Sequence, residues 1–264
     1  MQPPVAISIA GSDSSSGAGI QADLKTFTRF GVYALTVVTC VVAEVPGIVS
    51  SIHAIDKETI RKQIELGLDH FPISVVKTGM LYSAEVVDMV GDTLEALEPR
   101  YRPMVVLDPV MIATSGDPLI QPDALERYLS RLFPLATVVT PNLDEASVLL
   151  NRPLKSVDEM RDAAVELYQK FGVPFLLKGG HLRLAKAIDF LADRDGVRTF
   201  SEPCHQGVTT HGTGCTYSAA IAANLALNRP LAESIAVAKQ YISEAIQKSF
   251  RWDWNGRTVF ALRH

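Results

Sequence analysis

The segment Gly212-Thr213-Gly214-Cys215-Thr216 has the composition of an anion-binding loop. It precedes a predicted helix rich in small residues, and its glycines would allow backbone N–H groups to approach an anion closely. Because the helix N-terminus adds partial positive charge, the loop could hold a phosphoryl group during transfer. A tight turn that starts a helix explains the same residues equally well. The spacing differs from that of a Walker A loop, and no full G-x-G-x-x-G pattern follows the first predicted strand.

Polar and charged side chains occur where the predicted strands end. They are Asp13, Lys77, Asp108, Asn142 and Lys178. In a parallel sheet covered by helices, ligands bind beyond the carboxyl ends of the strands. We therefore expect these scattered segments to meet at one edge of the sheet.

Short apolar runs alternate with segments of helical period, which predicts an α/β fold with a mostly parallel sheet covered on both faces. The expected strands are Val5–Ala10, Val32–Val42, Ser74–Lys77, Met104–Leu107, Thr137–Thr140 and Pro174–Leu177, followed by the antiparallel pair Ala187–Ala192 and Val197–Ser201. The expected helices are Ala18–Phe30, Lys57–Leu68, Ser83–Leu97, Asp123–Leu132, Glu145–Leu150, Val157–Phe171, Gly214–Leu227 and Leu231–Phe250. No linker or repeat divides the chain, so we expect a single domain over residues 1–264.

The charge pattern disfavours nucleic acid as a partner, because the net charge is −4 and no basic stripe is present. The longest apolar run, Val32–Val45, is short for a membrane span and contains Glu44. The first residues have no basic stretch typical of a signal peptide. The 3 cysteines are too few and too scattered for a disulfide framework or a zinc site, which favours a cytoplasmic location.

A set of short motifs follows in a fixed order along roughly residues 5 to 248. The motifs are Ala10–Asp13 with Ser16–Thr26, Val76–Leu81, Leu107–Met111 with Ser115–Asp117, Thr140–Leu143 with Glu145, Lys178–His181 and His211–Thr216. Each motif alone is weak evidence, but together they are highly specific. With these motifs the chain resembles the hydroxymethylpyrimidine/phosphomethylpyrimidine kinases of thiamine biosynthesis, in the pyridoxal kinase branch of the ribokinase-like superfamily.

The resemblance implies a three-layer α/β/α ribokinase-like fold and transfer of the ATP γ-phosphoryl group to a pyrimidine alcohol and then to its monophosphate. It also implies Mg²⁺ and a homodimer. By position, the substrate-binding residues would be Gly11, Asp23, Glu44, Met80 and Val110. Asn142 and Glu145 would organise Mg²⁺, whereas Lys178, Thr213 and Asp108 would lie at the ATP phosphates. Gly212, Gly214, Cys215 and Lys178 would form the catalytic group.

Several of these residues have an ordinary structural alternative. Asp23 lies on an amphipathic helix and could face water, and Met80 could belong to the core. Asn142 could cap the following helix, with Glu145 completing a capping box. His181 and His211 are expected to be structural or loop residues.

At two positions the residue differs from the one found in related kinases of the superfamily. Cys215 stands where sugar kinases of the superfamily carry an aspartate base. A thiol at a helix N-terminus has a depressed pKa in many proteins, so Cys215 could accept the proton of the alcohol. Glu44 stands where the resemblance predicts glutamine. An ionised carboxylate only accepts hydrogen bonds, so Glu44 predicts pH-dependent binding or a somewhat different ring.

Other functions stay open at this stage. A pyridoxal kinase has the same loop, and pyridoxal also has a hydroxymethyl group on an aromatic ring, so dual use is possible. A non-catalytic pyrimidine sensor is disfavoured because the phosphate-site residues are present. A nucleotide-dependent oxidoreductase is disfavoured by the missing dinucleotide fingerprint.

Overall fold

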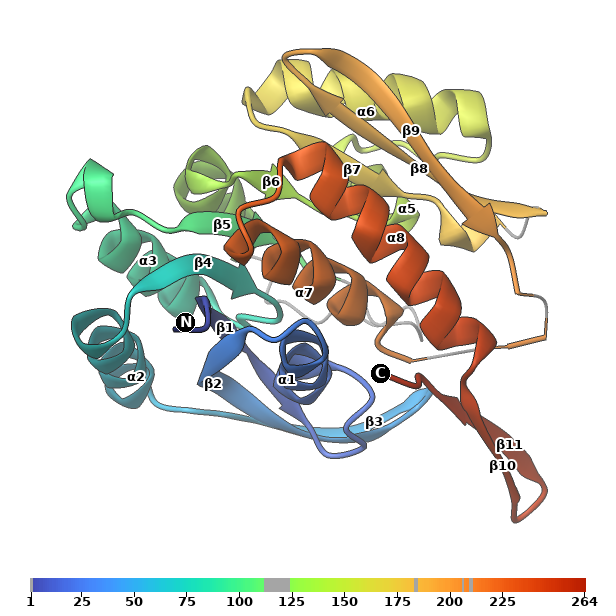
Figure 1. The fold of residues 1–264 in the computed structure, drawn as a ribbon, viewed down its shortest axis with the longest axis horizontal. Coiled ribbons are helices and arrows are strands. Elements are labelled where there is room, and N and C mark those ends of the chain that lie inside the picture. Colours follow the sequence, from blue (N-terminus) through green and yellow to red (C-terminus); the bar gives the residue numbers. More distant parts are fainter. Residues whose placement is uncertain (1, 112–123, 183–184, 206, 209–210) are drawn as a thin grey trace.

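A computed structural model describes residues 2–111, 124–182, 185–205, 207–208 and 211–264. Among these residues, nine strands form one sheet in the order β3-β2-β1-β4-β5-β6-β7-β8-β9 (Figure 1). The six strands from β2 to β7 in that order are parallel, and β3, β8 and β9 are antiparallel to their neighbours. The predicted, mostly parallel sheet is therefore confirmed.

The strands of the sheet are β1 (Val5–Asp13), β2 (Tyr33–Val45), β3 (Ile48–Ala54), β4 (Ile73–Thr78), β5 (Met104–Leu107), β6 (Val138–Val139), β7 (Phe175–Lys178), β8 (Lys186–Asp193) and β9 (Gly196–Pro203). The helices are α1 (Gly19–Arg29), α2 (Lys57–His70), α3 (Ala84–Glu95), α4 (Ala124–Arg127), α5 (Leu143–Leu149), α6 (Val157–Phe171), α7 (Thr213–Ala226) and α8 (Leu231–Gln247). A π-helical turn, Tyr128–Leu132, continues α4, and a hairpin of β10 (Phe250–Trp254) and β11 (Arg257–Ala261) follows α8.

Helices cover both faces of the sheet, which gives the three expected layers. One core contains apolar residues of α2, α3 and α6, and the other contains those of α1, α7 and α8. Successive strand residues alternate between these cores, as Val75 and Val76 of β4 do, because side chains of a strand point to opposite faces. Helix α7 has small residues and is buried along most of its length, so it packs closely between the sheet and its neighbours α1 and α8.

Differences from the sequence expectation are found at β1, at β3 and at the last helix, among other changes at element ends. β1 continues to Asp13, because Ser12 and Asp13 pair with Val41 and Val42 of β2. The prediction missed β3, whose residues are largely exposed and show no apolar alternation. The last helix ends at Gln247, so the prediction that it reaches Phe250 was wrong, and the chain turns into the β10–β11 hairpin.

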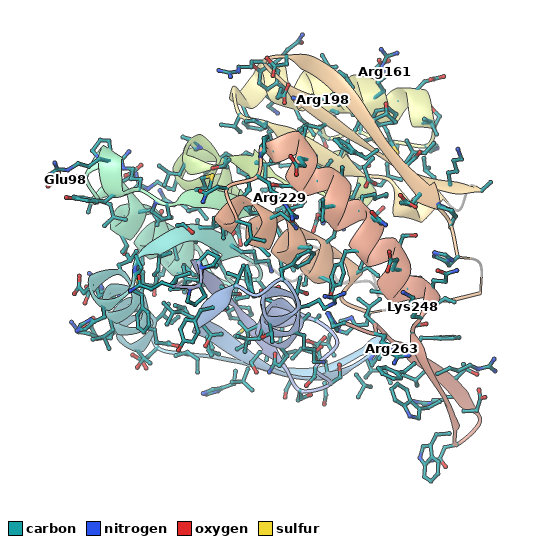
Figure 2. The ribbon with its side chains drawn as sticks, in the orientation of Figure 1. Glu98, Arg161, Arg198, Arg229, Lys248 and Arg263 are labelled. Carbon is teal, nitrogen blue, oxygen red and sulfur yellow. The ribbon has the colours of Figure 1, made fainter. Side chains whose placement is uncertain are left out.

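Labelled charged residues such as Glu98, Lys248 and Arg263 lie around the periphery of the molecule (Figure 2). Within the described ranges, no helix has the length and apolarity needed to cross a bilayer. The motif Ser115–Asp117 lies outside the described residues. The single domain over residues 1–264 stays a prediction, supported by a sheet that runs from β1 to β9 without a break.

Candidate active site

Asp108 and Lys178 meet at the carboxyl edge of the sheet, as the sequence predicts. Lys178 Nζ lies 3.0 Å from Asp108 Oδ1, and both side chains are nearly buried. Thr140 donates to the same oxygen over 3.2 Å, and Ser218 of α7 donates to Asp108 Oδ2 over 3.1 Å. Asp108 therefore links the ends of β5 and β7 to the helix that follows the glycine loop.

The glycine loop lies directly beside this pair. A Cβ atom built on Gly214 would lie 3.3 Å from Lys178 Nζ and 3.9 Å from Asp108 Oδ2. Gly212 is the N-cap residue of α7 with φ of 79°, a left-handed conformation that favours glycine. A cation at the N-terminus of a long buried helix is a second observation, besides composition, that favours an anion site over a simple turn.

Two buried carboxylates, those of Asp108 and Glu145, act on the single ammonium group of Lys178. Burial disfavours the Lys178 ammonium group, but the carboxylates of Asp108 and Glu145 raise its pKa above the ordinary value. Burial also disfavours the Asp108 carboxylate, but Lys178 and Lys77 hold its pKa below the ordinary value. Burial raises the pKa of Glu145 to about 7, with Lys178 opposing and Asp108 adding to the shift. Two carboxylates thus compete for the Lys178 cation.

Asn142 and Glu145 form the capping box that the sequence offered as an alternative. Asn142 Oδ1 accepts from Glu145 N over 2.9 Å, and Glu145 Oε2 accepts from Asn142 N over 2.8 Å. Glu145 Oε1 accepts from Met111 N over 3.1 Å. Each carboxylate oxygen keeps further acceptor capacity, and hard oxygen ligands in a site short of positive charge suit Mg²⁺. The residues therefore fit the metal, and their role as ligands stays a prediction.

Gly11, Met80 and Val110 gather at a small apolar cluster with Cys40 and Val42. A Cβ atom on Gly11 would lie 2.9 Å from Cys40 Sγ and 3.8 Å from Met80 Sδ. Val110 has φ of 41°, a conformation that is rare for a β-branched residue and indicates local strain beside the cluster. The structure thus brings together three of the predicted substrate residues in one small, largely buried apolar cluster.

Asp23 has a different environment from the one expected for a water-facing or pocket-lining acid. Its carboxylate is fully buried, lies 2.9 Å from Lys77 Nζ and accepts from Ser8 Oγ over 2.5 Å. Burial disfavours the Lys77 cation, but Asp23 and the nearby Cys215 and Asp108 raise its pKa. Asp23 Oδ1 has no hydrogen-bond partner among the described residues. Contact between Asp23 and a substrate stays a prediction.

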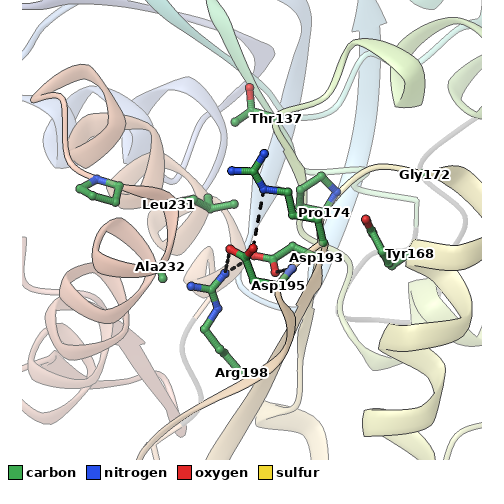
Figure 3. A pocket seen from close by; sticks show the side chains of 11 residues that line it. Thr137, Tyr168, Gly172, Pro174, Asp193, Asp195, Arg198, Leu231 and Ala232 are labelled. Carbon is green, nitrogen blue, oxygen red and sulfur yellow. Dashed lines mark hydrogen bonds and ion pairs between the residues drawn. The ribbon is translucent and has the colours of Figure 1, made fainter.

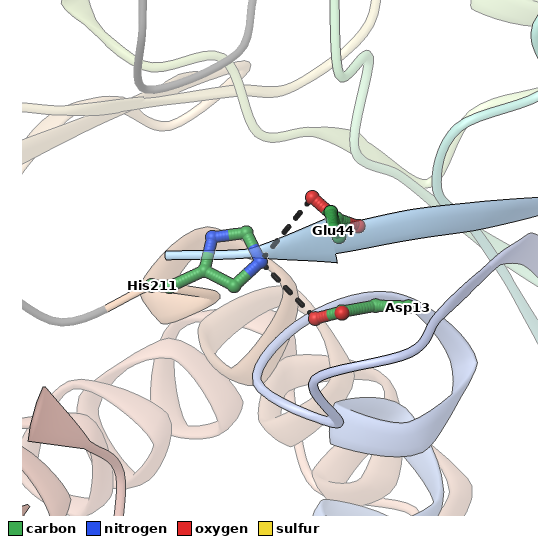
Figure 4. Close-up of side chains that lie close together, drawn as sticks. All are labelled: Asp13, Glu44 and His211. Carbon is green, nitrogen blue, oxygen red and sulfur yellow. Dashed lines mark hydrogen bonds and ion pairs between the residues drawn. The ribbon is translucent and has the colours of Figure 1, made fainter. Parts of the chain in front are cut away.

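A cluster that the sequence interpretation missed joins Asp13, Glu44 and His211 (Figure 4). His211 Nε2 lies 3.1 Å from Asp13 Oδ2 and 3.6 Å from Glu44 Oε2. Burial opposes the His211 imidazolium, but Asp13 and Glu44 raise its pKa. The position of His211 directly before Gly212 was the feature of the sequence that could have indicated a role for His211 at the glycine loop. A metal fits this cluster poorly, because Asp13 Oδ2 already accepts from Gly17 N over 3.0 Å and Ala18 N over 2.7 Å.

The expectation of a depressed Cys215 pKa was wrong. Burial raises the pKa of the thiol to about 11, and the carboxylates of Asp108 and Asp23 add to that effect. Lys77 lowers it, but this lysine is already paired with Asp23. Cys215 is therefore a neutral thiol at neutral pH in the ligand-free protein.

A hollow of about 450 Å³ lies at the opposite edge of the sheet, near the amino ends of β6 and β7 (Figure 3). Its rim includes Arg198, which pairs with Asp193 and lies 3.6 Å from Asp195. These ion pairs satisfy the charges of the rim, and none of the predicted site residues lines the hollow.

The comparisons with known proteins agree with the geometry at the carboxyl edge. Residues 13–258 match the phosphomethylpyrimidine kinase family. The chain belongs to this family. It is 40% identical over 248 residues to the hydroxymethylpyrimidine/phosphomethylpyrimidine kinase of Rhizobium meliloti, covering 94% of this chain and 92% of that protein. Membership of a family of kinases makes the chain a phosphotransferase.

The chain is also similar to a bifunctional protein of thiamine biosynthesis and to a pyridoxal kinase of known structure. The chain is 43% identical over 241 residues to the thiamine biosynthesis bifunctional protein ThiED of Geobacter sulfurreducens, which covers 91% of this chain and 49% of that protein. It therefore spans about half the length of this relative. The structure of an ADP complex of Bacillus subtilis pyridoxal kinase superimposes with a TM-score of 0.87 at 36% identity, covering 99% and 98% of the two chains. This similarity confirms the ribokinase-like fold.

Proposed function

We propose that this chain transfers the γ-phosphoryl group of ATP to 4-amino-5-hydroxymethyl-2-methylpyrimidine and then to the resulting monophosphate, in thiamine biosynthesis. The observation that carries the proposal is the position of the nearly buried Lys178 ammonium group beside Gly214 at the start of α7. The relatives named as hydroxymethylpyrimidine/phosphomethylpyrimidine kinases support the substrate, and the ADP complex of a relative supports the nucleotide. We further propose a cytoplasmic homodimer.

The roles of the residues follow from their positions. Lys178 and the N–H groups of the loop from Gly212 to Gly214 would neutralise the transferred phosphoryl group, and Asp108 would hold Lys178 in place. Thr213, the first residue of α7, would contact the nucleotide phosphates. Asn142 and Glu145 would hold Mg²⁺, which supplies charge neutralisation at the phosphates when bound. Gly11, Glu44, Met80 and Val110 would hold the ring.

The second candidate is a pyridoxal kinase or a dual-specificity enzyme. The observation that favours it is the TM-score of 0.87 to Bacillus subtilis pyridoxal kinase. The test is ATP consumption by the purified protein with the hydroxymethylpyrimidine, its monophosphate and pyridoxal measured side by side. Turnover of both pyrimidines supports the proposal. Turnover of pyridoxal alone contradicts it and selects the second candidate.

The proton of the alcohol distinguishes the two phosphoryl transfers. A pyrimidine alcohol must lose its proton, whereas a phosphomonoester with a second pKa of about 6 is already largely dianionic at neutral pH. Because burial raises the pKa of the Cys215 thiol to about 11, the thiol is not poised to accept that proton. We therefore expect Cys215→Ala to lower kcat for the alcohol and kcat for the monophosphate by similar factors. Single-turnover rates with each substrate measure the two losses, and Cys204→Ala is the matched control. A loss about tenfold larger for the alcohol would contradict this expectation and assign the proton transfer to Cys215.

The carboxylate of Glu44 is expected to make ring binding pH-dependent. Burial raises the pKa of Glu44, with Asp13 adding to the shift and His211 opposing it. A protonated Glu44 can donate to a ring nitrogen, so KM for the neutral aminopyrimidine should fall as pH falls. Glu44→Gln donates at every pH, and its KM should be flat and low. Identical KM profiles for wild type and variant between pH 5.5 and pH 8.5 would contradict this role.

A further inference from the structure

A buried ion pair joins β8 to α8, and it has no part in the proposed roles of the site residues. Asp189 Oδ2 of β8 lies 2.6 Å from Lys239 Nζ of α8, and the two side chains are 1% and 8% exposed. The Lys239 ammonium group also lies 5.7 Å from the ring centroid of Tyr217, two residues beyond Cys215 in α7. The pair therefore joins β8 to the helices that follow the glycine loop.

The second oxygen of Asp189 holds the backbone at the phosphate-binding lysine. Gly179 N donates to Asp189 Oδ1 over 3.0 Å, and Gly179 is the residue directly after Lys178. The turn passes so close to β8 that a Cβ atom on Gly179 would lie 2.2 Å from the carbonyl oxygen of Ile188. The backbone after Lys178 is therefore held by this side-chain hydrogen bond and by close packing, while Lys178 itself pairs with β8 and donates from its N atom to the carbonyl oxygen of Pro141.

The Lys178 side chain starts at this fixed point and ends beside the glycine loop. Its Nζ atom contacts Asp108 on one side and faces Gly214 on the other. Asp108 therefore holds the charged end of the side chain, and Asp189 contributes one of the contacts that hold the backbone from which it extends. A misplacement of about 1 Å at a reacting group costs up to about a hundredfold in rate.

We propose that Asp189 is a positioning residue for nucleotide binding: through the Gly179 amide it places Lys178 at the ATP phosphates, and Lys239 neutralises and orients its carboxylate. The proposal rests on the proposed function, in which Lys178 meets the phosphates. A purely structural role predicts a different outcome, because buried ion pairs are often replaceable by apolar residues without loss of stability.

Two double variants separate the two roles. Asp189→Asn with Lys239→Met and Asp189→Leu with Lys239→Met both remove the two charges together, so neither leaves an uncompensated buried charge. Only the first keeps an oxygen that can accept from Gly179 N. We expect the asparagine variant to bind ADP within about twofold of wild type and the leucine variant to bind about tenfold more weakly. Isothermal titration calorimetry measures the affinity for ADP. A rise in KM for ATP with little change in kcat would show that the loss lies in nucleotide binding.

Equal ADP affinities in the two double variants, at equal melting temperatures, would overturn the proposal. If the leucine variant does not fold, Asp189→Ala with Lys239→Met takes its place, because alanine also lacks the acceptor and is smaller. ADP binding needs no pyrimidine substrate. Failure of wild type to phosphorylate either pyrimidine would thus reject the proposed function and leave the measurement on Asp189 intact.

Discussion

Replacement of Gly212 by alanine is expected to lower kcat/KM for ATP by more than about a hundredfold, because it separates the two loops that form the site. A Cβ atom on Gly212 would lie 1.8 Å from the carbonyl oxygen of Gly17, a distance that requires backbone movement. The movement would also disturb His211, whose ring would lie 3.0 Å from a Cβ atom built on Gly17 and whose Nε2 atom lies 3.1 Å from Asp13 Oδ2. The N–H groups at the start of α7 would then no longer point at a common anion.

Gly172→Ala is the matched control for this variant. Gly172 has φ of 71°, against 79° for Gly212, so alanine meets a similar left-handed backbone cost of about 1 kcal/mol at both positions. Among the described residues, no heavy atom lies within 4 Å of a Cβ built on Gly172. Steady-state kinetics and melting temperatures for both variants distinguish the clash from the backbone cost. Equal activity in the two variants would show that the loop contact does not shape the site.

The sequence predicted most of the fold because the central strands are short apolar runs bounded by glycine, proline or polar residues. A strand buried on both faces is mainly apolar, as β5 and β6 are throughout and β7 is up to its last residue, Lys178. The exposed strand β3 and the β10–β11 hairpin lack it, because neither is covered by helices and their side chains are largely exposed. Their pairing depends on a neighbouring strand rather than on local composition.

The candidate site was predictable where it depends on topology and less so where it depends on packing. Parallel strands bring their carboxyl ends together, so Asp108 and Lys178 could be placed at one edge before any contact was known. The burial of Asp23 depends on how α1 lies on the sheet. The spacing of Ile20, Asp23 and Phe27 puts them on one helix face, and this could have indicated that Asp23 is buried. In the structure all three residues are buried.

Opposing effects act on the pKa of the Cys215 thiol. The helix N-terminus favours the thiolate, as the sequence argument anticipated, and Lys77 adds to that effect in the structure. Burial acts in the opposite direction and is the larger effect, so the pKa rises to about 11. Desolvation depends on how α7 packs between α1 and the sheet, and local sequence does not specify it.

Lys178→Met is expected to lower kcat at saturating ATP by about 10²- to 10³-fold, as loss of one preorganised charge at a transferred oxyanion does. The ammonium group is the cation that contacts Asp108 and lies beside the loop at Gly214. Methionine keeps the length of the stem without the charge, so the effect measures electrostatics rather than packing. It also leaves Asp108 without this partner, and the negative charge that remains would repel the phosphates of the nucleotide.

The matched control for Lys178→Met is Lys186→Met, at the exposed start of β8, which makes the same chemical change away from the site. Its kcat should stay within about twofold of wild type, because surface substitutions have small effects. Melting temperatures should be compared as well, since removal of one partner from a buried ion pair also destabilises the fold. If the folded Lys178→Met enzyme keeps kcat within about threefold of wild type, Lys178 is not the group that stabilises the charge of the transition state. The glycine loop and the N-terminus of α7 would then be the groups that stabilise the transferred phosphoryl group.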